Sequence, residues 1–520
     1  MIKDESKKYV IDNCILVIFA YIINYIYGSI GVLSQDTFAY FDTGYRVLQG
    51  SVPFIDYWTV SGPFIDFFQA TIFYIFGVSW KSYILSGSLI NILITILFYN
   101  VLREYKLSRK INLFYCLSFS ILANPSMGVP FPDHFSSFFS LGAILLFLIL
   151  IKKKDNFYWA AIPFLFFIAF FSKQTPATYL LLSFLIILAF YLYLYKKINF
   201  IKYFILSSFL CLSVFLLFLY INSINFENFT NQYILFPRTI GEERLDSYKF
   251  SVNSILNNFK FIFFTLSLVL INIFFQFKNN RVRIEKDRFL INITLILVSF
   301  SFIFHQILTM NFIYIFFLIP LIAGLTHSSY FKDKKIYSFF GILLILMTTF
   351  TTAKYHFRFN ENRKMLNLEK INLDISVDSV EIDARLKGLK WITKNYSKNP
   401  AEEIKIVKDI IEKIKKDQNK IMLYSHYLFL SAITDKDLNS PTRWPSQADA
   451  SNPSSKNKFY PVYLKFVKNL VEKKNIAIIY STIEEKHDIF NVIFDQKCRK
   501  SEEINEVLKK HDIRNCYKLK

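Results

Sequence analysis

Residues 202–221 read KYFILSSFLCLSVFLLFLYI, and this stretch decides the fold class. After Lys202 it carries no charged residue. Its length matches the roughly 20 apolar residues that a helix needs to cross the hydrocarbon core of a bilayer. Comparable apolar runs recur through the first two thirds of the chain. The sequence therefore predicts a polytopic α-helical membrane protein.

The overall composition agrees with this class. The chain has 520 residues, of which 53% are hydrophobic and 59 are Phe, and its mean hydropathy is +0.31. We expect about eleven spans, near residues 13–33, 82–102, 110–123, 134–151, 157–171, 177–195, 202–221, 257–277, 289–309, 311–327 and 335–353. A shorter run near 64–77, which Pro63 opens, is predicted to lie along the membrane surface. No small-residue cleavage site follows the first span, so we expect that span to be retained.

Lysine and arginine gather in alternate loops. The basic loops are 103–110, 152–154, 196–202, 278–288 and 332–335, and the N-terminus carries Lys3, Lys7 and Lys8. With eleven spans all of them fall on one side, which the positive-inside rule assigns to the cytoplasm. We therefore predict a multi-pass protein of the cytoplasmic (inner) membrane, with the N-terminus inside and the C-terminus outside.

The formal net charge of +21 has the same origin. Much of the excess lies in the predicted cytoplasmic loops, where it sets the topology and attracts anionic membrane lipids. No basic segment interleaved with aromatic residues is present, so the sequence does not indicate nucleic-acid binding.

The composition changes near residue 354, which predicts two domains, 1–353 and 354–520. The second has fewer Phe and many more charges. Its sequence predicts helices at Ala401–Lys416 and Lys465–Lys474 and short buried strands at Ile421–Tyr424 and Asn475–Tyr480. The order of helix and strand favours a small α/β domain with a parallel sheet, outside the cytoplasm.

Cys498 and Cys516 are the only cysteines of the C-terminal domain. Outside the cytoplasm such a pair can form a disulfide. The sequence leaves the disulfide and two free thiols equally open, and it contains no Cys/His spacing of a zinc site.

The first outer loop, residues 34–81, carries the candidate catalytic carboxylate Asp36. The alternative is that Ser34 or Asp36 caps a surface helix. Asp42 and Arg46 stand four apart and are expected to pair as an ordinary exposed salt bridge of that helix. Six helical steps of about 100° turn Asp42 away from Asp36, so the two do not form one paired-carboxylate site.

The second outer loop ends with Asp133 and His134 at the start of a span. Asp133 either caps that helix or brings a second acidic group over the membrane surface beside Asp36. If the two loop acids meet, they would also hold a divalent cation. No cofactor is otherwise indicated.

Three cations are candidates for binding a phosphate. Lys173 lies on the predicted outer side, where the positive-inside pattern disfavours it, so we expect a specific anionic partner such as a lipid phosphate. Arg238 and Arg244 in a later outer loop can each present a planar fork to a phosphate. His305, in a late span, is interpreted as an ordinary helix contact.

Several of these residues together resemble a known family. The pattern consists of Asp36, the run Gly50–Trp58 with Gly62 and Pro63, Asp133, Ser172–Thr175, and the segments Tyr427–Ala432 and Asn439–Pro441 in the C-terminal domain. It resembles the bacterial relatives of the protein O-mannosyltransferases and the lipid A aminoarabinose transferase, all of the GT-C glycosyltransferase class.

The resemblance implies an enzyme that uses a polyprenyl-phosphate sugar at the outer face of the membrane and needs its first-loop acid. Asp36 is then the general base, with Asp133 as the second catalytic acid. The substrate-binding candidates are Lys173, Arg238, Arg244, Asp56, Tyr57 and His134. The protein mannosyltransferases carry an adjacent Asp-Glu pair, whereas Gln35 and Thr37 flank Asp36 here. This difference favours a lipid or glycan hydroxyl acceptor over a protein hydroxyl.

Two other functions stay open. A flippase or transporter of lipid-linked glycans would place charges inside the spans and often shows internal repeats, but the spans are nearly free of charge. A surface-glycan polymerase or ligase would share the compartment and the donor. Such proteins typically carry their large functional loop late in the chain.

Overall fold

A computed structural model describes residues 2–517, except 125–126, 154–155, 248–250, 279–285, 312–314, 331–334, 446–448, 483–488 and 496. The chain divides into two compact units. Unit 1 comprises Met1–Gly28, Gly87–Leu216 and Asp246–Met365. Unit 2 comprises Ser29–Ser86, Leu217–Leu245 and Leu366–Lys520.

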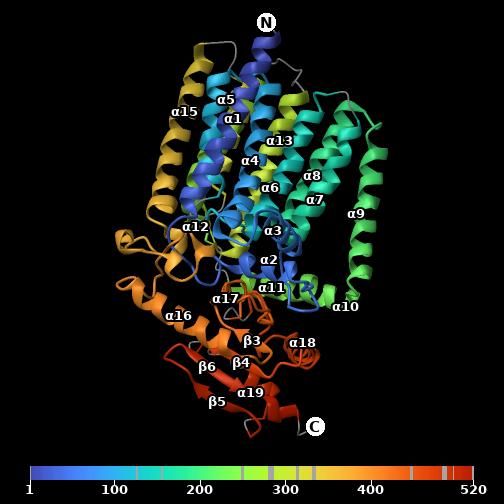
Figure 1. Ribbon diagram of the computed structural model, residues 1–520. Helices are drawn as coiled ribbons and strands as arrows, with labels where there is room; N and C mark the ends of the chain where they lie inside the picture. Colours follow the sequence, from blue (N-terminus) through green and yellow to red (C-terminus); the bar gives the residue numbers. More distant parts are fainter. Residues whose placement is uncertain are drawn as a thin grey trace. The chain divides into compact units, whose positions relative to one another are not determined.

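Unit 1 is built from α-helices. They are α1 (Ile2–Tyr27), α4 (Trp80–Glu104), α5 (Arg109–Ala123), α6 (Pro132–Leu150), α7 (Ala161–Ser172), α8 (Gln174–Tyr195), α9 (Ile201–Ile221), α12 (Val252–Lys278), α13 (Lys286–Thr309), α14 (Leu318–Tyr330) and α15 (Lys335–His356). Helix α1 packs beside α5, and α8 packs against both α6 and α13 (Figure 1).

Among the described residues, seven helices are long and apolar enough to cross a membrane, and three more apolar helices are shorter. The polytopic helical class is therefore confirmed, with seven to ten apolar helices in the described part of the chain, and the expected count of about eleven spans stays a prediction. The shorter apolar helices are Pro63–Phe76, Phe157–Ser172 and Leu318–Ser328. The predicted span 110–123 corresponds to α5, which has only 15 residues. At that length it is not among the seven helices counted above.

The first span differs from its predicted position. We expected residues 13–33, but α1 ends at Tyr27. The following residues leave the helix and pair with a strand, because Gly31 N and Val32 N donate to Lys390 O and Ile392 O at 3.0 and 2.9 Å. Asp36 is therefore not adjacent to the end of a membrane helix.

Unit 2 combines loops from the first half of the chain with the C-terminal residues. Its first part holds α2 (Ala39–Leu48) and α3 (Pro63–Phe76), and its second part holds α10 (Phe226–Phe229), a π-helical turn (Thr230–Leu235) and the start of α11 (Phe236–Ser247). These compact units do not coincide with the boundary expected at 353/354. The loops belong with the C-terminal residues because hydrogen bonds and buried ion pairs join them.

The C-terminal part contains a small α/β region, as predicted. Its helices are α16 (Pro400–Lys416), α17 (Leu430–Thr434), α18 (Tyr460–Lys473) and α19 (Phe490–Ile493), and its strands are β1 (Val377–Asp378), β2 (Lys390–Trp391), β3 (Ile421–Tyr424), β4 (Ile478–Thr482), β5 (Lys500–Glu503) and β6 (Leu508–Asp512). Strands β3 and β4 are parallel, which confirms the expected pairing. The four-stranded sheet has the order β3-β4-β6-β5, and its last two strands, which run antiparallel, were not predicted.

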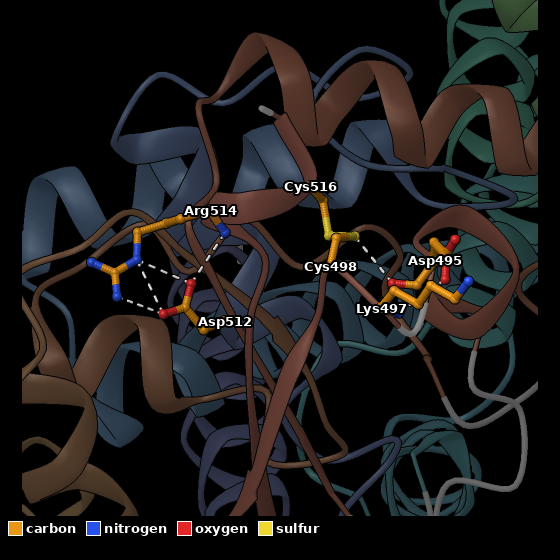
Figure 2. Close-up of a disulfide and its surroundings, with 6 residues drawn as sticks. All are labelled: Asp495, Lys497, Cys498, Asp512, Arg514 and Cys516. Atoms are coloured by element: carbon orange, nitrogen blue, oxygen red, sulfur yellow. Dashed lines mark hydrogen bonds and ion pairs between the residues drawn. A yellow bond between two sulfur atoms is a disulfide. The ribbon is translucent and has the colours of Figure 1, made fainter. Parts of the chain in front are cut away.

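Cys498 and Cys516 form a disulfide, which resolves the alternative that the sequence left open (Figure 2). It joins the residues just before β5 to the end of the chain after β6. Much of the basic loops at 278–288 and 332–335 lies outside the described residues. The predicted orientation of the chain across the membrane is not tested by the fold and stays a prediction.

Candidate functional site

Asp36 lies in a turn that leads into α2. Its backbone N donates to Leu33 O at 3.0 Å, and its carbonyl accepts from Ala39 N at 3.3 Å. Its side chain is half-buried. The N-cap position of α2 is Phe38, so Asp36 is not the N-cap residue of that helix. Capping of α2 therefore does not account for this carboxylate, and its catalytic role stays a prediction.

Asp42 and Arg46 pair as the spacing predicts, but not on an exposed surface. Arg46 Nη1 is 3.8 Å from Asp42 Oδ2, and both residues are 1% exposed. The expectation of an ordinary exposed salt bridge is therefore wrong. Helical spacing reports which side chains are neighbours and not whether another part of the chain covers them.

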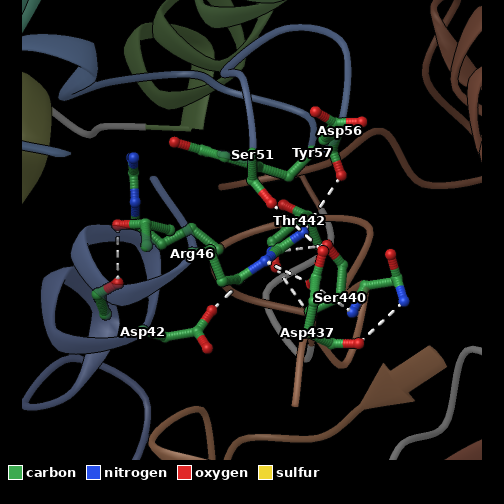
Figure 3. A network of polar contacts seen from close by, with 12 residues as sticks. Asp42, Arg46, Ser51, Asp56, Tyr57, Asp437, Ser440 and Thr442 are labelled. Atoms are coloured by element: carbon green, nitrogen blue, oxygen red, sulfur yellow. Dashed lines mark hydrogen bonds and ion pairs between the residues drawn. The ribbon is translucent and has the colours of Figure 1, made fainter. Parts of the chain in front are cut away.

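The element that covers Arg46 comes from the C-terminal residues (Figure 3). Arg46 Nη1 donates to Ser440 O at 2.9 Å, Nη2 donates to Asp56 O at 3.2 Å, and Nε lies 3.4 Å from Asp437 Oδ1. Burial alone would raise the pKa of Asp437, but the Arg46 charge holds that pKa below its ordinary value. Burial raises the pKa of Asp42 to about 6 although Arg46 opposes the change. Asp437 is thus the stronger ionic partner of Arg46.

A second buried ion pair joins α3 to the same C-terminal loop. Arg443 Nη2 donates to both carboxylate oxygens of Asp66, at 2.7 and 2.5 Å, and Nη1 donates to Ser61 O. Asp66 also accepts from Tyr57 OH at 2.8 Å and from Thr43 Oγ1 at 2.5 Å. Burial would lower the pKa of the Arg443 guanidinium, but Asp66 raises it above its ordinary value. Four parts of unit 2 therefore meet at one carboxylate.

Two substrate-binding candidates in the first loop have protein partners. Tyr57 is fully buried and donates to Asp66. Asp56 is 5% exposed, accepts from Val52 N at 2.8 Å, and lies 3.0 Å from Lys474 Nζ. The structure thus places both side chains in the packing of unit 2.

The glycine in the Gly62-Pro63 pair has a defined structural reason. Gly62 is the N-cap of α3 and has a φ of 78°, in the left-handed region that favours glycine. A Cβ there would come within 2.5 Å of the ring of Tyr40. Pro63 follows at the first turn of α3, where its missing N–H costs nothing.

In unit 1, Asp133 forms a buried cluster with Lys173 and His305. Lys173 Nζ lies 2.9 and 2.8 Å from the two carboxylate oxygens of Asp133, and His305 Nε2 lies 2.8 Å from Oδ1. Asp133 and His305 are 2% and 1% exposed. The N-cap of α6 is Phe131, so Asp133 is not the capping residue. An anionic partner such as a lipid phosphate was expected for Lys173, and in the structure the partner is the carboxylate of Asp133.

His305 was interpreted as an ordinary helix contact, and this interpretation was incomplete. It is a member of the Asp133 cluster although 172 residues separate the two. The signal in the sequence is a histidine inside an apolar span, which is costly to bury without a polar partner. His134 is also buried, at 2% exposed, and lies between the rings of Phe131 and Phe138.

The two arginines of the later outer loop lie in α11. Arg238 is exposed and its Nε donates to Glu242 Oε1 at 2.8 Å, one helical turn away. Arg244 is half-exposed in the last part of the same helix. Asp36, Arg238 and Arg244 belong to unit 2, whereas Asp133, His134 and Lys173 belong to unit 1. In the described part of the chain, no group of three or more His, Cys, Asp or Glu residues could hold a metal ion.

Comparisons with known proteins identify the fold. No protein-family model matches the sequence, and no curated protein matches it significantly. The structure is similar to the lipid A aminoarabinose transferase ArnT from Cupriavidus metallidurans bound to undecaprenyl phosphate, with a TM-score of 0.52, 11% identity, and coverage of 96% of this chain and 97% of ArnT. For ArnT in the apo state the TM-score is 0.50, the identity is 11%, and the coverage is 98% and 99%. The predicted resemblance is confirmed for the fold: over nearly its whole length, the chain folds like a GT-C membrane glycosyltransferase.

Proposed function

We propose that the protein transfers a sugar from a polyprenyl-phosphate donor to a hydroxyl acceptor at the outer face of the cytoplasmic membrane. The observation that carries the proposal is the near full-length similarity in fold to an enzyme whose structure contains undecaprenyl phosphate. A lipid-linked donor also suits the predicted site, because no nucleotide sugar is available outside the cytoplasm and the sequence has no Gly-rich phosphate loop.

The disulfide supports the proposed side of the membrane. Disulfides form and persist in oxidising compartments, and Cys498 and Cys516 are paired at the C-terminal end of the chain. The basic loops of the sequence independently place the C-terminus outside by the positive-inside rule.

Asp36 is the proposed general base. Its carboxylate takes the proton of the acceptor hydroxyl as that oxygen attacks the anomeric carbon of the sugar. The bond from the anomeric carbon to the phosphate oxygen breaks, and polyprenyl phosphate leaves. Asp36 is preferred over Asp42 and Asp66 because those two carboxylates are buried beside Arg46 and Arg443.

The leaving phosphate needs cations to stabilise its growing charge. Arg238 and Arg244, which lie in the same unit as Asp36, are the cations proposed for this role. Lys173, in unit 1, is proposed separately as a substrate-binding residue. Arg238 is exposed, and among the described residues its guanidinium contacts only Glu242 of its own helix, so a phosphate can compete for it. We propose that Asp133 orients Lys173, because both carboxylate oxygens of Asp133 accept hydrogen bonds from the Lys173 ammonium.

The proposed acceptor is a lipid or glycan hydroxyl. The reason is that Gln35 and Thr37 flank Asp36, where the protein mannosyltransferases carry an acidic neighbour. A protein hydroxyl is the remaining alternative. No divalent cation is required by this scheme, since Asp36 acts as the base and the basic side chains neutralise the phosphate.

A flippase or transporter of lipid-linked glycans is the second candidate. The observation that favours it is the buried cluster of Asp133 on α6, Lys173 directly before α8, and His305 on α13. Ionisable groups inside helical bundles often mark a transport path. Such a protein would move the lipid without breaking the sugar–phosphate bond.

One experiment separates the two. Purified protein is incubated with polyprenyl-phosphate sugars and a membrane lipid or glycan extract, and free polyprenyl phosphate is measured by chromatography. Time-dependent release supports sugar transfer. Movement of intact donor across the bilayer of reconstituted vesicles, with no release in any mixture, would favour the flippase.

A further inference from the structure

The loop at residues 437–445 is fixed to the sheet of the C-terminal part. Leu423 N in β3 donates to Leu438 O at 2.7 Å, and Asn439 Nδ2 donates to Ile421 O at 3.0 Å. At the far end of the loop, Tyr424 OH donates to Pro445 O at 2.9 Å. This 437–445 loop is therefore held along β3 at both of its ends.

The same loop contacts residues 36–66, which are part of the predicted first outer loop, at several positions. Ser440 O accepts from Arg46 Nη1 at 2.9 Å (Figure 3). Pro441 O accepts from Trp58 N at 2.8 Å. Ser51 Oγ donates to Asp437 Oδ2 at 3.3 Å. We call residues 36–66 the 36–66 segment.

Two ion pairs of opposite direction join the loop to the segment: Arg443–Asp66 is fully buried, whereas in Asp437–Arg46 only the arginine is buried and Asp437 is 29% exposed. The 437–445 loop supplies the acid in Asp437–Arg46 and the base in Arg443–Asp66. A buried charge is strongly destabilising without its partner, so each pair fixes one relative position of loop and segment. Two pairs with exchanged signs also exclude a shifted register, because a shift would bring like charges together.

The position of Asp36 follows from these contacts. Thr43 and Arg46 both lie on α2, and they bond to Asp66 and to the 437–445 loop. Asp36 is joined to the start of α2 by the hydrogen bond from Ala39 N. Displacement of α2 would therefore carry Asp36 with it.

We propose that the 437–445 loop positions the 36–66 segment for catalysis, with Arg443 and Asp437 as its positioning residues; this rests on the proposed sugar transfer with Asp36 as base. The C-terminal part of the chain is then a component of the active site and not an accessory domain. Neither residue touches the substrate. Each acts through α2 and α3 on the placement of Asp36.

The test compares Arg443→Lys and Asp437→Asn with Arg514→Met as the matched control. Arg514 is an exposed arginine in the same part of the chain, and it pairs with Asp512 at 2.5 Å. Arg443→Lys keeps the charge but cannot bond to Asp66 and Ser61 together. Asp437→Asn removes the charge that pairs with Arg46 and leaves the Arg443–Asp66 pair in place, so it keeps the proposal testable if the Arg443 variant does not fold.

Two quantities are measured on monodisperse protein below its unfolding temperature. Hydrogen–deuterium exchange of peptides covering 36–66 should increase in both variants and not in Arg514→Met. Turnover per folded molecule should fall by about 10²-fold, with the KM for the donor changed by less than about twofold, because misplacement of a catalytic group affects kcat more than ground-state binding.

Unchanged exchange in the 36–66 segment in both variants, or wild-type turnover in their folded fractions, would overturn the proposal. A purely structural role predicts the latter, since it lowers the amount of folded protein only. If the wild-type protein releases no polyprenyl phosphate, the proposed function fails, and the exchange measurement alone still decides whether the loop positions the segment.

Discussion

Arg443 and Asp66 lie 377 residues apart in the sequence, and the guanidinium of one contacts both carboxylate oxygens of the other. Both side chains are at most 1% exposed. A buried pair of this kind joins two distant parts of the chain in one geometry, because either charge alone would be buried without compensation. It joins the segment before α4 to the C-terminal residues within unit 2.

Removal of Arg443 should therefore destabilise the protein strongly. Arg443→Met leaves the Asp66 carboxylate without its cation, which we expect to cost about 3–5 kcal/mol. The thermal unfolding midpoint of the purified protein in detergent measures the loss. Arg514→Met, which breaks an exposed pair, should leave the midpoint unchanged. Equal midpoints for the two variants would mean that the Arg443–Asp66 pair does not hold unit 2 together.

The stability of unit 2 should also depend on pH through Asp42. Its pKa is about 6 in the folded protein, above the ordinary 3.8, so the folded state binds the proton more tightly. This contribution is fully present below about pH 4 and is lost as the pH rises through about 6. The difference corresponds to about 3 kcal/mol.

Asp42→Asn should consequently raise the unfolding midpoint at pH 7.5 and flatten its dependence on pH between 4 and 7. Arg46 keeps Asp437 as its ionic partner in this variant. Asp374→Asn, at an exposed position, serves as the control. A lower midpoint for Asp42→Asn at pH 7.5 would show instead that Asp42 stabilises the fold as a charged partner of Arg46.

The Asp133 cluster predicts unequal effects of two substitutions at His305. His305→Leu removes a hydrogen-bond partner of a buried carboxylate and should cost about 1–3 kcal/mol. His305→Gln retains an N–H donor at the end of the side chain and should cost clearly less. The unfolding midpoints of the two variants in the same detergent provide the comparison. Equal losses would indicate that His305 contributes through packing alone.

Asp36→Asn keeps the size and polarity of the side chain but removes the base. Turnover should fall by about 10²–10⁴, the usual contribution of general acid–base catalysis. The unfolding midpoint should not change, since Asp36 lies outside α2 and is half-buried. Asp374→Asn again provides the matched control. Near-normal turnover of Asp36→Asn would assign catalysis to another residue.

The orientation across the membrane can be read from single cysteines. Ser454→Cys should react with an impermeant maleimide from outside the cell, and Lys153→Cys only after the membrane is opened. Both positions are described and lie outside the apolar helices. Labelling with the opposite sidedness would refute the positive-inside assignment of the C-terminus.

Local patterns in the sequence predict those parts of the fold that depend on nearby residues. Helix α16 and strand β3 lie where the periodicity of the chain places them. The sequence does not predict strands β5 (KSEE) and β6 (LKKHD), because neither shows alternating apolar residues. They form a sheet only because β4 offers an edge to pair with.

In the candidate site, too, local spacing predicts some contacts and fails to predict others. The spacing of Asp42 and Arg46 predicts their pairing, but their burial depends on Asp437 and Ser440, which are distant in sequence. No local pattern identifies the carboxylate partners of Arg443 and His305, since those partners lie 377 and 172 residues away. Contacts of this range arise from the tertiary fold and cannot be read from periodicity.

The products formed from a polyprenyl-phosphate sugar test the proposed sugar transfer most directly. Purified wild-type protein and Asp36→Asn are incubated with the donor and the acceptor extract, and mass spectrometry quantifies both free polyprenyl phosphate and glycosylated acceptor. Sugar transfer predicts that the wild-type protein forms the two products in equal amounts and that Asp36→Asn forms almost none. Intact donor after prolonged incubation with folded wild-type protein, across the panel of sugars and acceptors, would contradict it.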